Sequence, residues 1–217
     1  MAAAAGDRLK ITEVFHSLQG EASFSGWPTV FIRLTGCPLR CQYCDTAYAF
    51  TGGEWREIAA LVDEARSYGA KHVCVTGGEP LAQPKCIDLL QALCDAGFDV
   101  SLETSGAIDI SAVDARVCRV VDIKTPGSNE SARNLDSNIA CLTARDVVKF
   151  VICGRDDYDW ARQWLAEHPG LPCEVYFSPS FHELEARDLA DWILADRLPV
   201  RLQLQLHKLL WGDVPGH

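Results

Sequence analysis

The stretch Cys37-Pro-Leu-Arg-Cys41-Gln-Tyr-Cys44-Asp-Thr46 places three cysteines within eight residues, at the spacing C-x3-C-x2-C. Thiolates are soft ligands, and a compact group of them selects zinc, Cu(I) or an iron–sulfur cluster. A closed structural zinc site takes four protein ligands, and a [4Fe–4S] cube has four irons to ligate. Three thiolates therefore leave one coordination position open for chemistry. The alternatives are a zinc knuckle with a distant fourth ligand, and three unrelated thiols in a loop.

The composition is that of a globular protein with an ordinary core. The chain has 217 residues, of which 48% are hydrophobic and 23% charged. This length suits one domain, so residues 1–217 are expected to form a single unit. The formal net charge of −10 argues against a surface that grips nucleic acid or an anionic membrane. No apolar run reaches the length of about 18 residues that a membrane span needs.

The start of the chain and the remaining cysteines point to a reducing compartment. Met1 to Gly6 is rich in alanine, but Asp7 and Arg8 follow at once, so no apolar signal-peptide core is present and we expect a cytoplasmic protein. Most of the seven other cysteines lie in apolar segments, where buried free thiols are the expected state. They are Cys74, Cys86, Cys94, Cys118, Cys141, Cys153 and Cys173.

Strand and helix patterns alternate along the chain. Thr29 to Thr35 is a β-branched and aromatic run that predicts a strand. The hydrophobic patterns predict further strands over 10–17, 71–76, 98–103, 117–123, 146–152, 174–177 and 201–206, and helices over 54–68, 84–96, 157–167 and 183–195. Alternating strands and helices indicate a mostly parallel sheet. A full eightfold barrel takes about 250 residues, so we expect an incomplete, splayed α/β barrel of roughly six to seven strands, with an N-terminal strand extension and a C-terminal tail.

Polar or glycine-rich loops follow the predicted strands. Because the carboxyl ends of parallel strands share one face, where ligands bind in α/β folds, these loops are expected to build one site. The loops are the cysteine stretch, Thr76-Gly-Gly-Glu-Pro80, Glu103-Thr-Ser-Gly106, Lys124-Thr-Pro-Gly-Ser128 and Ser178-Pro-Ser180.

The cysteine spacing, followed by Asp45 and Thr46, resembles the signature of the radical S-adenosylmethionine (SAM) superfamily. In that superfamily three cysteines hold three irons, and SAM chelates the fourth through its amino and carboxylate groups. Reduction of the cluster cleaves SAM and releases a 5′-deoxyadenosyl radical. Residues 76–80 resemble the glycine-rich motif that holds the SAM amino group, because glycine lets backbone carbonyls approach an ammonium closely. A tight turn before a helix is the alternative for this motif, and a helix N-cap is the alternative for Ser105.

The stretch Ser17-Leu-Gln-Gly-Glu21 suits a nitrogen heterocycle. Glutamine both donates and accepts hydrogen bonds, while an ionised glutamate only accepts them. Such a pair reads an amino group beside a ring N–H, as in guanine or a pterin. A polar turn between two strands is the alternative.

One family combines these features. Residues 13–21, Arg33, the cysteine loop, residues 76–80, residues 103–106 and Leu206-His-Lys208 together resemble 7-carboxy-7-deazaguanine synthases of queuosine biosynthesis, over nearly the whole chain. The resemblance implies a lyase that converts 6-carboxy-5,6,7,8-tetrahydropterin to 7-carboxy-7-deazaguanine with loss of ammonia. It also implies one [4Fe–4S] cluster, catalytic use of SAM, a Mg²⁺ ion, an electron donor such as a flavodoxin or ferredoxin, and a homodimer.

The resemblance also assigns site residues. Cys37, Cys41 and Cys44 would hold the cluster, and Thr46 would bind Mg²⁺, a hard cation that prefers oxygen. Arg33 would pair with the substrate carboxylate, which a guanidinium fork fits through two hydrogen bonds. The substrate set is Leu18, Gln19, Gly20, Glu21, Arg33 and Thr76. The SAM set is Tyr43, Cys44, Asp45, Gly78, Ser105, Asp122, Ile123, Lys124, Ser178, Pro179, Ser180 and Phe181. The tail, Asp213 to His217, would fold over the substrate.

Two other functions share parts of the pattern. A radical SAM activase, which generates a glycyl radical on a partner protein, matches the cysteines and residues 76–80 but has no use for Gln19 to Glu21. A non-catalytic zinc-binding α/β module would be colourless and indifferent to SAM.

Overall fold

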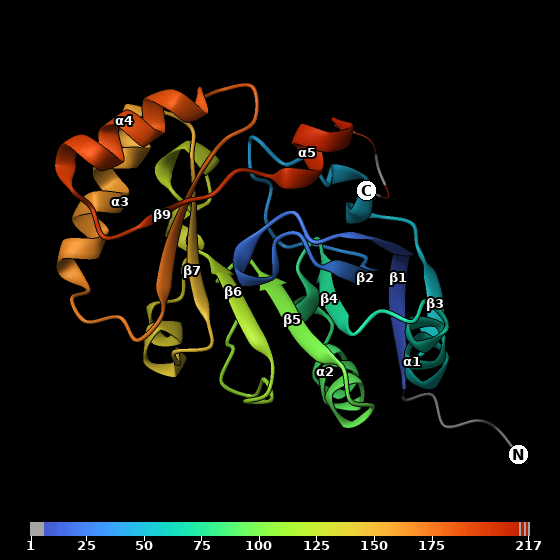
Figure 1. Cartoon of the computed structure of the whole chain (residues 1–217). Coiled ribbons are helices and arrows are strands. Elements are labelled where there is room, and N and C mark those ends of the chain that lie inside the picture. Colours follow the sequence, from blue (N-terminus) through green and yellow to red (C-terminus); the bar gives the residue numbers. More distant parts are fainter. Residues whose placement is uncertain (1–6, 213, 215, 217) are drawn as a thin grey trace, which may run out of the picture.

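A single open sheet organises the computed structural model, which describes residues 7–212, 214 and 216 (Figure 1). Within these residues the sheet has nine strands, in the order β3-β1-β2-β4-β5-β6-β7-β8-β9. Seven of them pair in parallel: β2 (Pro28–Leu34), β4 (His72–Gly77), β5 (Asp99–Thr104), β6 (Cys118–Asp122), β7 (Val147–Ile152), β8 (Glu174–Pro179) and β9 (Arg201–Leu202). At one edge β1 (Arg8–Leu18) and β3 (Glu54–Glu57) pair antiparallel. The splayed parallel barrel is confirmed, and the antiparallel edge raises the strand count above the predicted one.

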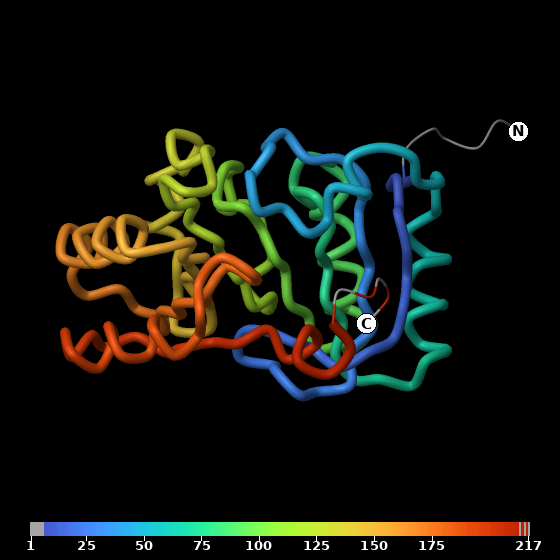
Figure 2. Tube along the Cα trace, turned by 90° about the horizontal axis from the view of Figure 1, so that it is seen from above, coloured from blue at the N-terminus to red at the C-terminus, as the bar shows by residue number. Residues whose placement is uncertain are grey.

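Helices lie outside the sheet and bury one face each against it (Figure 2). They are α1 (Ile58–Ser67), α2 (Cys86–Asp95), α3 (Arg155–Glu167) and α4 (Ala186–Asp196). On α1 the buried residues are Ile58, Leu61, Val62 and Ala65, which is the helical spacing that the sequence shows. Full burial of each such leucine or isoleucine contributes about 1.5–3 kcal/mol. Short 3₁₀ helices span Ala22–Phe24, Ala47–Phe50, Pro80–Ala82, Pro126–Ser128, Ser131–Arg133 and Asp136–Cys141.

The predicted helix over 54–68 was wrong in its first turn. Residues 54–57 form β3, which pairs with β1 from Arg8↔Glu57 to Ile11↔Glu54. The outer edge of β1 has unpaired backbone groups, and a short extended segment satisfies them before the helix begins at Ile58. The helical pattern itself was correct, and it ends next to Gly69, whose φ is +70°.

The predicted last strand over 201–206 was also wrong. Only Arg201 and Leu202 pair with β8. The chain then leaves the sheet and forms α5 (Leu206–Trp211), a helix that the sequence patterns did not predict. In Figure 1 this helix lies across the ends of β2 and β4, near the C-terminus, and Figure 2 shows the segment crossing the molecule from the β9 side to the β1 side.

All ten cysteines are free in the described structure, as expected for reduced thiols. Cys74, Cys86, Cys94 and Cys118 are buried. No helix among the described residues has both the length and the apolar character needed to cross a membrane. Met1 to Gly6, whose composition entered the expectation of a cytoplasmic protein, lie outside the described residues.

His72 at the start of β4 makes the stability depend on pH. Its side chain is buried, its Nδ1 lies 2.8 Å from Thr29 Oγ1, and its ring stacks on Phe24. Burial lowers the pKa of His72 from 6.5 to about 4. The unfolded chain therefore takes up a proton near pH 6.5 while the folded chain stays neutral. The contribution of His72 to the free energy of unfolding is fully present above pH 6.5. It falls as the pH drops toward 4, by up to about 1.4 kcal/mol per pH unit.

A His72→Gln variant provides the comparison. Urea unfolding of both proteins is measured at pH 7 and at pH 5. Between these pH values the free energy of unfolding of the wild type should fall by about 1–2 kcal/mol more than that of the variant. Carboxylates titrate equally in the two proteins, so their contribution to the free energy of unfolding cancels in the comparison. Equal losses in the two proteins would show that His72 does not titrate in this way.

Candidate active site

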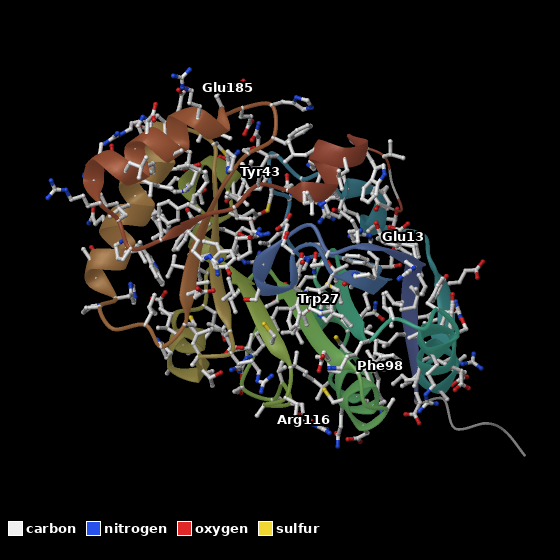
Figure 3. The ribbon with its side chains drawn as sticks, in the orientation of Figure 1. Glu13, Trp27, Tyr43, Phe98, Arg116 and Glu185 are labelled. Carbon is white, nitrogen blue, oxygen red and sulfur yellow. The ribbon has the colours of Figure 1, made fainter. Side chains whose placement is uncertain are left out.

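The loops that follow the parallel strands enclose a cavity of about 600 Å³. Every residue that the sequence assigned to substrate, SAM or metal lines this cavity, except Ile123, whose side chain is part of the main hydrophobic core. Figure 3 shows Tyr43 at the α5 end of the molecule, with Phe98 and Arg116 at the opposite end. The prediction that these loops meet at one face is confirmed.

The cysteine loop follows β2 and is held by backbone contacts on both sides. Gly36 N donates to Ala49 O at 2.8 Å, and Gln42 N donates to Ser128 O at 3.1 Å. The Arg40 guanidinium lies 4.2 Å from the centre of the Phe50 ring. These contacts fix a loop that carries three half-buried thiols toward the cavity.

The three thiols are the candidate ligands of a cluster. Burial raises the pKa of Cys37, Cys41 and Cys44, and the nearby Lys124 ammonium opposes that rise for each of them. Among the described residues, no group of three or more His, Cys, Asp or Glu side chains could hold one metal ion. In a [4Fe–4S] cube each thiolate binds a different iron, so the ligands need not converge on one point. The donor set therefore fits that cluster.

Gly78 lets the second motif touch the cysteine loop. Gly78 N donates to Leu34 O at 3.3 Å, and Glu79 N donates to Gly36 O at 2.9 Å. A Cβ atom at Gly78 would lie 2.4 Å from Gly36 O and 2.7 Å from Cys37 Cβ. Only glycine fits here, because the backbones of the two motifs cross at contact distance.

Glu79 connects the glycine motif to the loop after β5. Its buried carboxylate accepts hydrogen bonds from Leu81 N at 3.0 Å, Thr104 Oγ1 at 2.9 Å and Ser105 N at 2.6 Å. It also accepts from Ser105 Oγ. The Ser105 hydroxyl, which the resemblance assigned to SAM, thus has its hydrogen committed to Glu79 and offers a ligand only acceptor capacity.

Residues 19–21 begin a loop that a backbone hydrogen bond to Trp27 closes and that α5 covers. Gln19 N donates to Trp27 O at 2.9 Å, and Leu206 N donates to Gly20 O at 3.0 Å. A Cβ atom at Gly20 would lie 2.1 Å from His207 Nδ1. The helix therefore lies directly on the glycine of this loop.

Buried charges of both signs line the floor of the cavity. Lys149 Nζ lies 2.6 Å from Glu21 Oε2 and 3.5 Å from Asp122 Oδ2, and Lys124 Nζ lies 3.1 Å from Asp122 Oδ2. Burial raises the pKa of Glu21, but Lys149 and the hydrogen bonds outweigh this, so the pKa lies below its ordinary value. Burial and then the Glu21 charge raise the pKa of Glu103. From the described residues its carboxylate accepts only a long hydrogen bond from Gln19 Nε2, at 3.4 Å, and a weak one from Cys74 Sγ, at 3.8 Å.

Arg33 ends in the cavity with part of its guanidinium available. Its Nε donates to Glu13 Oε1 at 2.7 Å, and Tyr48 OH donates to the same oxygen at 2.8 Å. The guanidinium carbon lies 5.7 Å from the centre of the Phe15 ring. Within the described part of the chain its two terminal nitrogens have no hydrogen-bond partner. These two nitrogens of the guanidinium can therefore donate hydrogen bonds to a carboxylate.

Thr46 presents one oxygen for a hard cation. Its hydroxyl donates to Asp45 Oδ1 at 2.7 Å, which leaves the oxygen lone pairs for a metal. Asp45 is held from the other side by Lys208 Nζ at 2.8 Å, and although burial acts in the opposite direction, Lys208 lowers the pKa of Asp45 to about 2. Mg²⁺ takes one or two protein ligands together with water and substrate oxygens, so this site fits it.

Two buried polar side-chain atoms of the cavity lining lack partners. Tyr43 OH and Asp122 Oδ1 are buried and lack a hydrogen-bond partner among the described residues. The backbone of Lys124 is paired at both its N–H and its C=O with the Asn134 side chain, so any contact of Lys124 with a ligand falls to its side chain. Ser180 N donates to Ile152 O at 2.8 Å, which holds the loop after β8. These orphaned atoms fit a polar molecule such as SAM.

Several lining residues were given no site role by the sequence reasoning, among them Phe15, Tyr48, Glu103, Lys149, Gln205 and His207. Glu103 and His207 were named only as parts of motifs. Lys149 was read as a strand residue, although a charged residue inside an apolar strand is a signal of a buried partner. Of the tail, Val214 and Gly216 line the cavity, while Asp213, Pro215 and His217 lie outside the described residues.

The open barrel and its three-cysteine loop define a protein of the Radical SAM superfamily, and residues 31–120 match that superfamily. The chain belongs to the family of 7-carboxy-7-deazaguanine synthases. It is 45% identical over 208 residues to the protein of that name from Chlorobaculum tepidum, with 94% of each chain covered. It is 40% identical over 222 residues to the one from Koribacter versatilis, with 94% of this chain and 97% of the relative covered.

Solved structures agree with this assignment. The crystal structure of QueE from Escherichia coli superimposes with a TM-score of 0.76 at 26% identity, over 92% of this chain and 95% of that one. A structure of TYW1 with a lysine-pyruvate adduct bound has a TM-score of 0.54 at 14% identity, over 77% of this chain and 70% of that one, and shares the fold alone. Membership of the family removes the activase and the zinc module as alternatives.

Proposed function

We propose that this protein converts 6-carboxy-5,6,7,8-tetrahydropterin to 7-carboxy-7-deazaguanine with loss of ammonia, as a lyase of queuosine biosynthesis. The observation that carries the proposal is that the three-cysteine loop, the Gly78 contact and the Gln19–Glu21 loop line one cavity. The family shared with the relatives supports the same activity. Because one sheet runs through the described residues, we take the chain to be a single domain.

The SAM side of the cavity has the residues for a radical reaction. Cys37, Cys41 and Cys44 would hold the cluster, which together with SAM would supply radical chemistry at C6 of the pterin. The side chains of Tyr43, Asp122 and the loop after β8 position SAM. Gly78 keeps the backbone close enough to contact its amino group.

The pterin side reads the two ends of the substrate. Leu18 to Gly20 and Thr76 contact the pterin ring, and Glu103 adds a carboxylate that is short of donors and suits the ring amino group. The free side of the Arg33 guanidinium pairs with the 6-carboxylate. Thr46 would hold Mg²⁺ through its hydroxyl oxygen, and the ion would help to orient the substrate. Helix α5 covers this end and excludes water.

The cellular setting follows from the family resemblance and the chain's thiols. A flavodoxin or ferredoxin supplies the electron, two copies form a homodimer, and the enzyme works in the cytoplasm, where the ten thiols stay reduced.

An anaerobic assay tests the activity. The reconstituted protein receives reductant, SAM and the pterin, with and without Mg²⁺, and the product is identified by mass. Product that rises with Mg²⁺ supports the proposal. SAM cleavage without 7-carboxy-7-deazaguanine would refute the substrate assignment and keep the radical chemistry.

Arg33→Lys should weaken substrate binding about tenfold or more. A lysine keeps the charge but cannot offer two parallel N–H groups to a carboxylate, and a charge-assisted hydrogen bond contributes about 1.5–3 kcal/mol. The measurement is the KM for the pterin, with the KM for SAM expected to stay within about twofold. Arg66→Lys, at an exposed Arg66–Asp63 pair on α1, is the matched control. An unchanged pterin KM in Arg33→Lys would remove Arg33 from the substrate set.

A further inference from the structure

Lys149 contacts two parts of the active site, one on the pterin side and one on the SAM side. It lies on β7 and is buried. Its ammonium contacts Glu21 at 2.6 Å, in the loop that covers the pterin side, and Asp122 at 3.5 Å, at the end of β6 on the SAM side. The residues in contact are separated by 128 positions for Glu21 and Lys149, so only the fold brings them together.

These contacts fix the Glu21 carboxylate, so it has little freedom to form hydrogen bonds with the substrate. Its Oε2 accepts from Lys149, and its Oε1 accepts from Gln205 Nε2 at 2.7 Å. Glu21 N donates to Gln19 Oε1 at 3.3 Å, so the position of Glu21 also sets the orientation of the Gln19 amide. A shift of Glu21 would move the residue that faces Glu103.

The charges around Lys149 make its role specific. Three carboxylates line the cavity floor, those of Glu21, Glu103 and Asp122, and two ammonium groups oppose them, those of Lys124 and Lys149. Lys124 pairs with Asp122 but not with Glu21. Loss of Lys149 would remove the ammonium that Glu21 contacts, and a buried charge that loses its partner is strongly destabilised.

We propose that Lys149 is a positioning residue. It holds Glu21, in the loop of residues 19–21, against Asp122 at the end of β6. This contact sets where the pterin lies relative to SAM. The inference rests on the proposed function and adds a residue to it. Lys149 acts through Glu21 and is not required to touch the reacting atoms.

Lys149→Met and Glu21→Gln test this, each prepared as the holoenzyme. Binding of the pterin is measured by calorimetry without reductant. The ratio of 5′-deoxyadenosine to 7-carboxy-7-deazaguanine is measured with reductant. Each variant should weaken pterin binding about tenfold or more and raise the ratio, because a misplaced substrate lets SAM cleave without product. The double variant should exceed the larger single effect by no more than about twofold, since both changes break one contact.

Lys124→Met is the matched control, because it removes a buried lysine of the same cluster that does not contact Glu21. It should weaken SAM binding and leave pterin binding within about twofold. Wild-type pterin affinity in Glu21→Gln, multiplied effects in the double variant, or equal loss of pterin binding in Lys124→Met would overturn the proposal. If Lys149→Met does not fold, the Glu21→Gln and Lys124→Met results still decide it. A wild type that binds pterin but forms no product would contradict the proposed function instead.

Discussion

Replacing Cys41 with serine should abolish cluster assembly and with it both SAM cleavage and product formation. The three thiols on this loop are the donors present for the cluster, and an alkoxide is too hard and too basic to replace a thiolate on iron. Loss of an outer partner of a metal ligand already costs about 10–100-fold in activity or metal affinity, so loss of the ligand itself must cost more. Iron content, absorbance of the reconstituted protein and electron paramagnetic resonance of the reduced state measure the effect.

Cys141→Ser gives the matched comparison. Cys141 is also half-buried and free, but it packs against the hydrophobic core, its sulfur donates a weak hydrogen bond to the Ser137 carbonyl at 3.8 Å, and it does not line the cavity. It should assemble a normal cluster and turn over at the wild-type rate. A Cys41→Ser protein with a full cluster and normal SAM cleavage would rule out the cysteine loop as the cluster site.

Gly78→Ala should reduce activity about 100-fold while the protein still folds. The added methyl group would lie 2.4 Å from Gly36 O and 2.7 Å from Cys37 Cβ, so the loop carrying the first cysteine must move. Overpacking of this kind costs about 1–3 kcal/mol of stability, and a displacement of about 1 Å at a reacting centre costs about 100-fold in rate. Steady-state kinetics should show a lower kcat together with a higher KM for SAM.

Gly154→Ala separates this steric effect from the general cost of replacing a glycine. A Cβ at Gly154 meets nothing within 4 Å, and its φ is −177°, which any residue adopts. This variant should match the wild type. Normal kinetics in Gly78→Ala would mean that the two loops separate without consequence for SAM.

The sequence alone determined most of the order of elements and the candidate residues for the cofactors. Hydrophobic periodicity reports which face of a helix or strand is buried, so the parallel strands and the helices such as α1 and α2 were predicted within a few residues. The cysteine spacing and the Gly-Gly-Glu-Pro motif are local, because their chemistry depends on neighbours in sequence. The common face of their loops followed from the parallel arrangement.

Only the tertiary structure decided the contacts between distant residues. Residues 54–57 became a strand because β1 had an edge to satisfy, and residues 206–211 became a helix that lies on Gly20 instead of extending the sheet. Neither outcome has a local signal. In the same way Lys149 looks like one polar residue in an apolar strand until the fold brings Glu21 to within 2.6 Å of its ammonium. A buried charge needs a partner, and the sequence shows the need without showing which residue meets it.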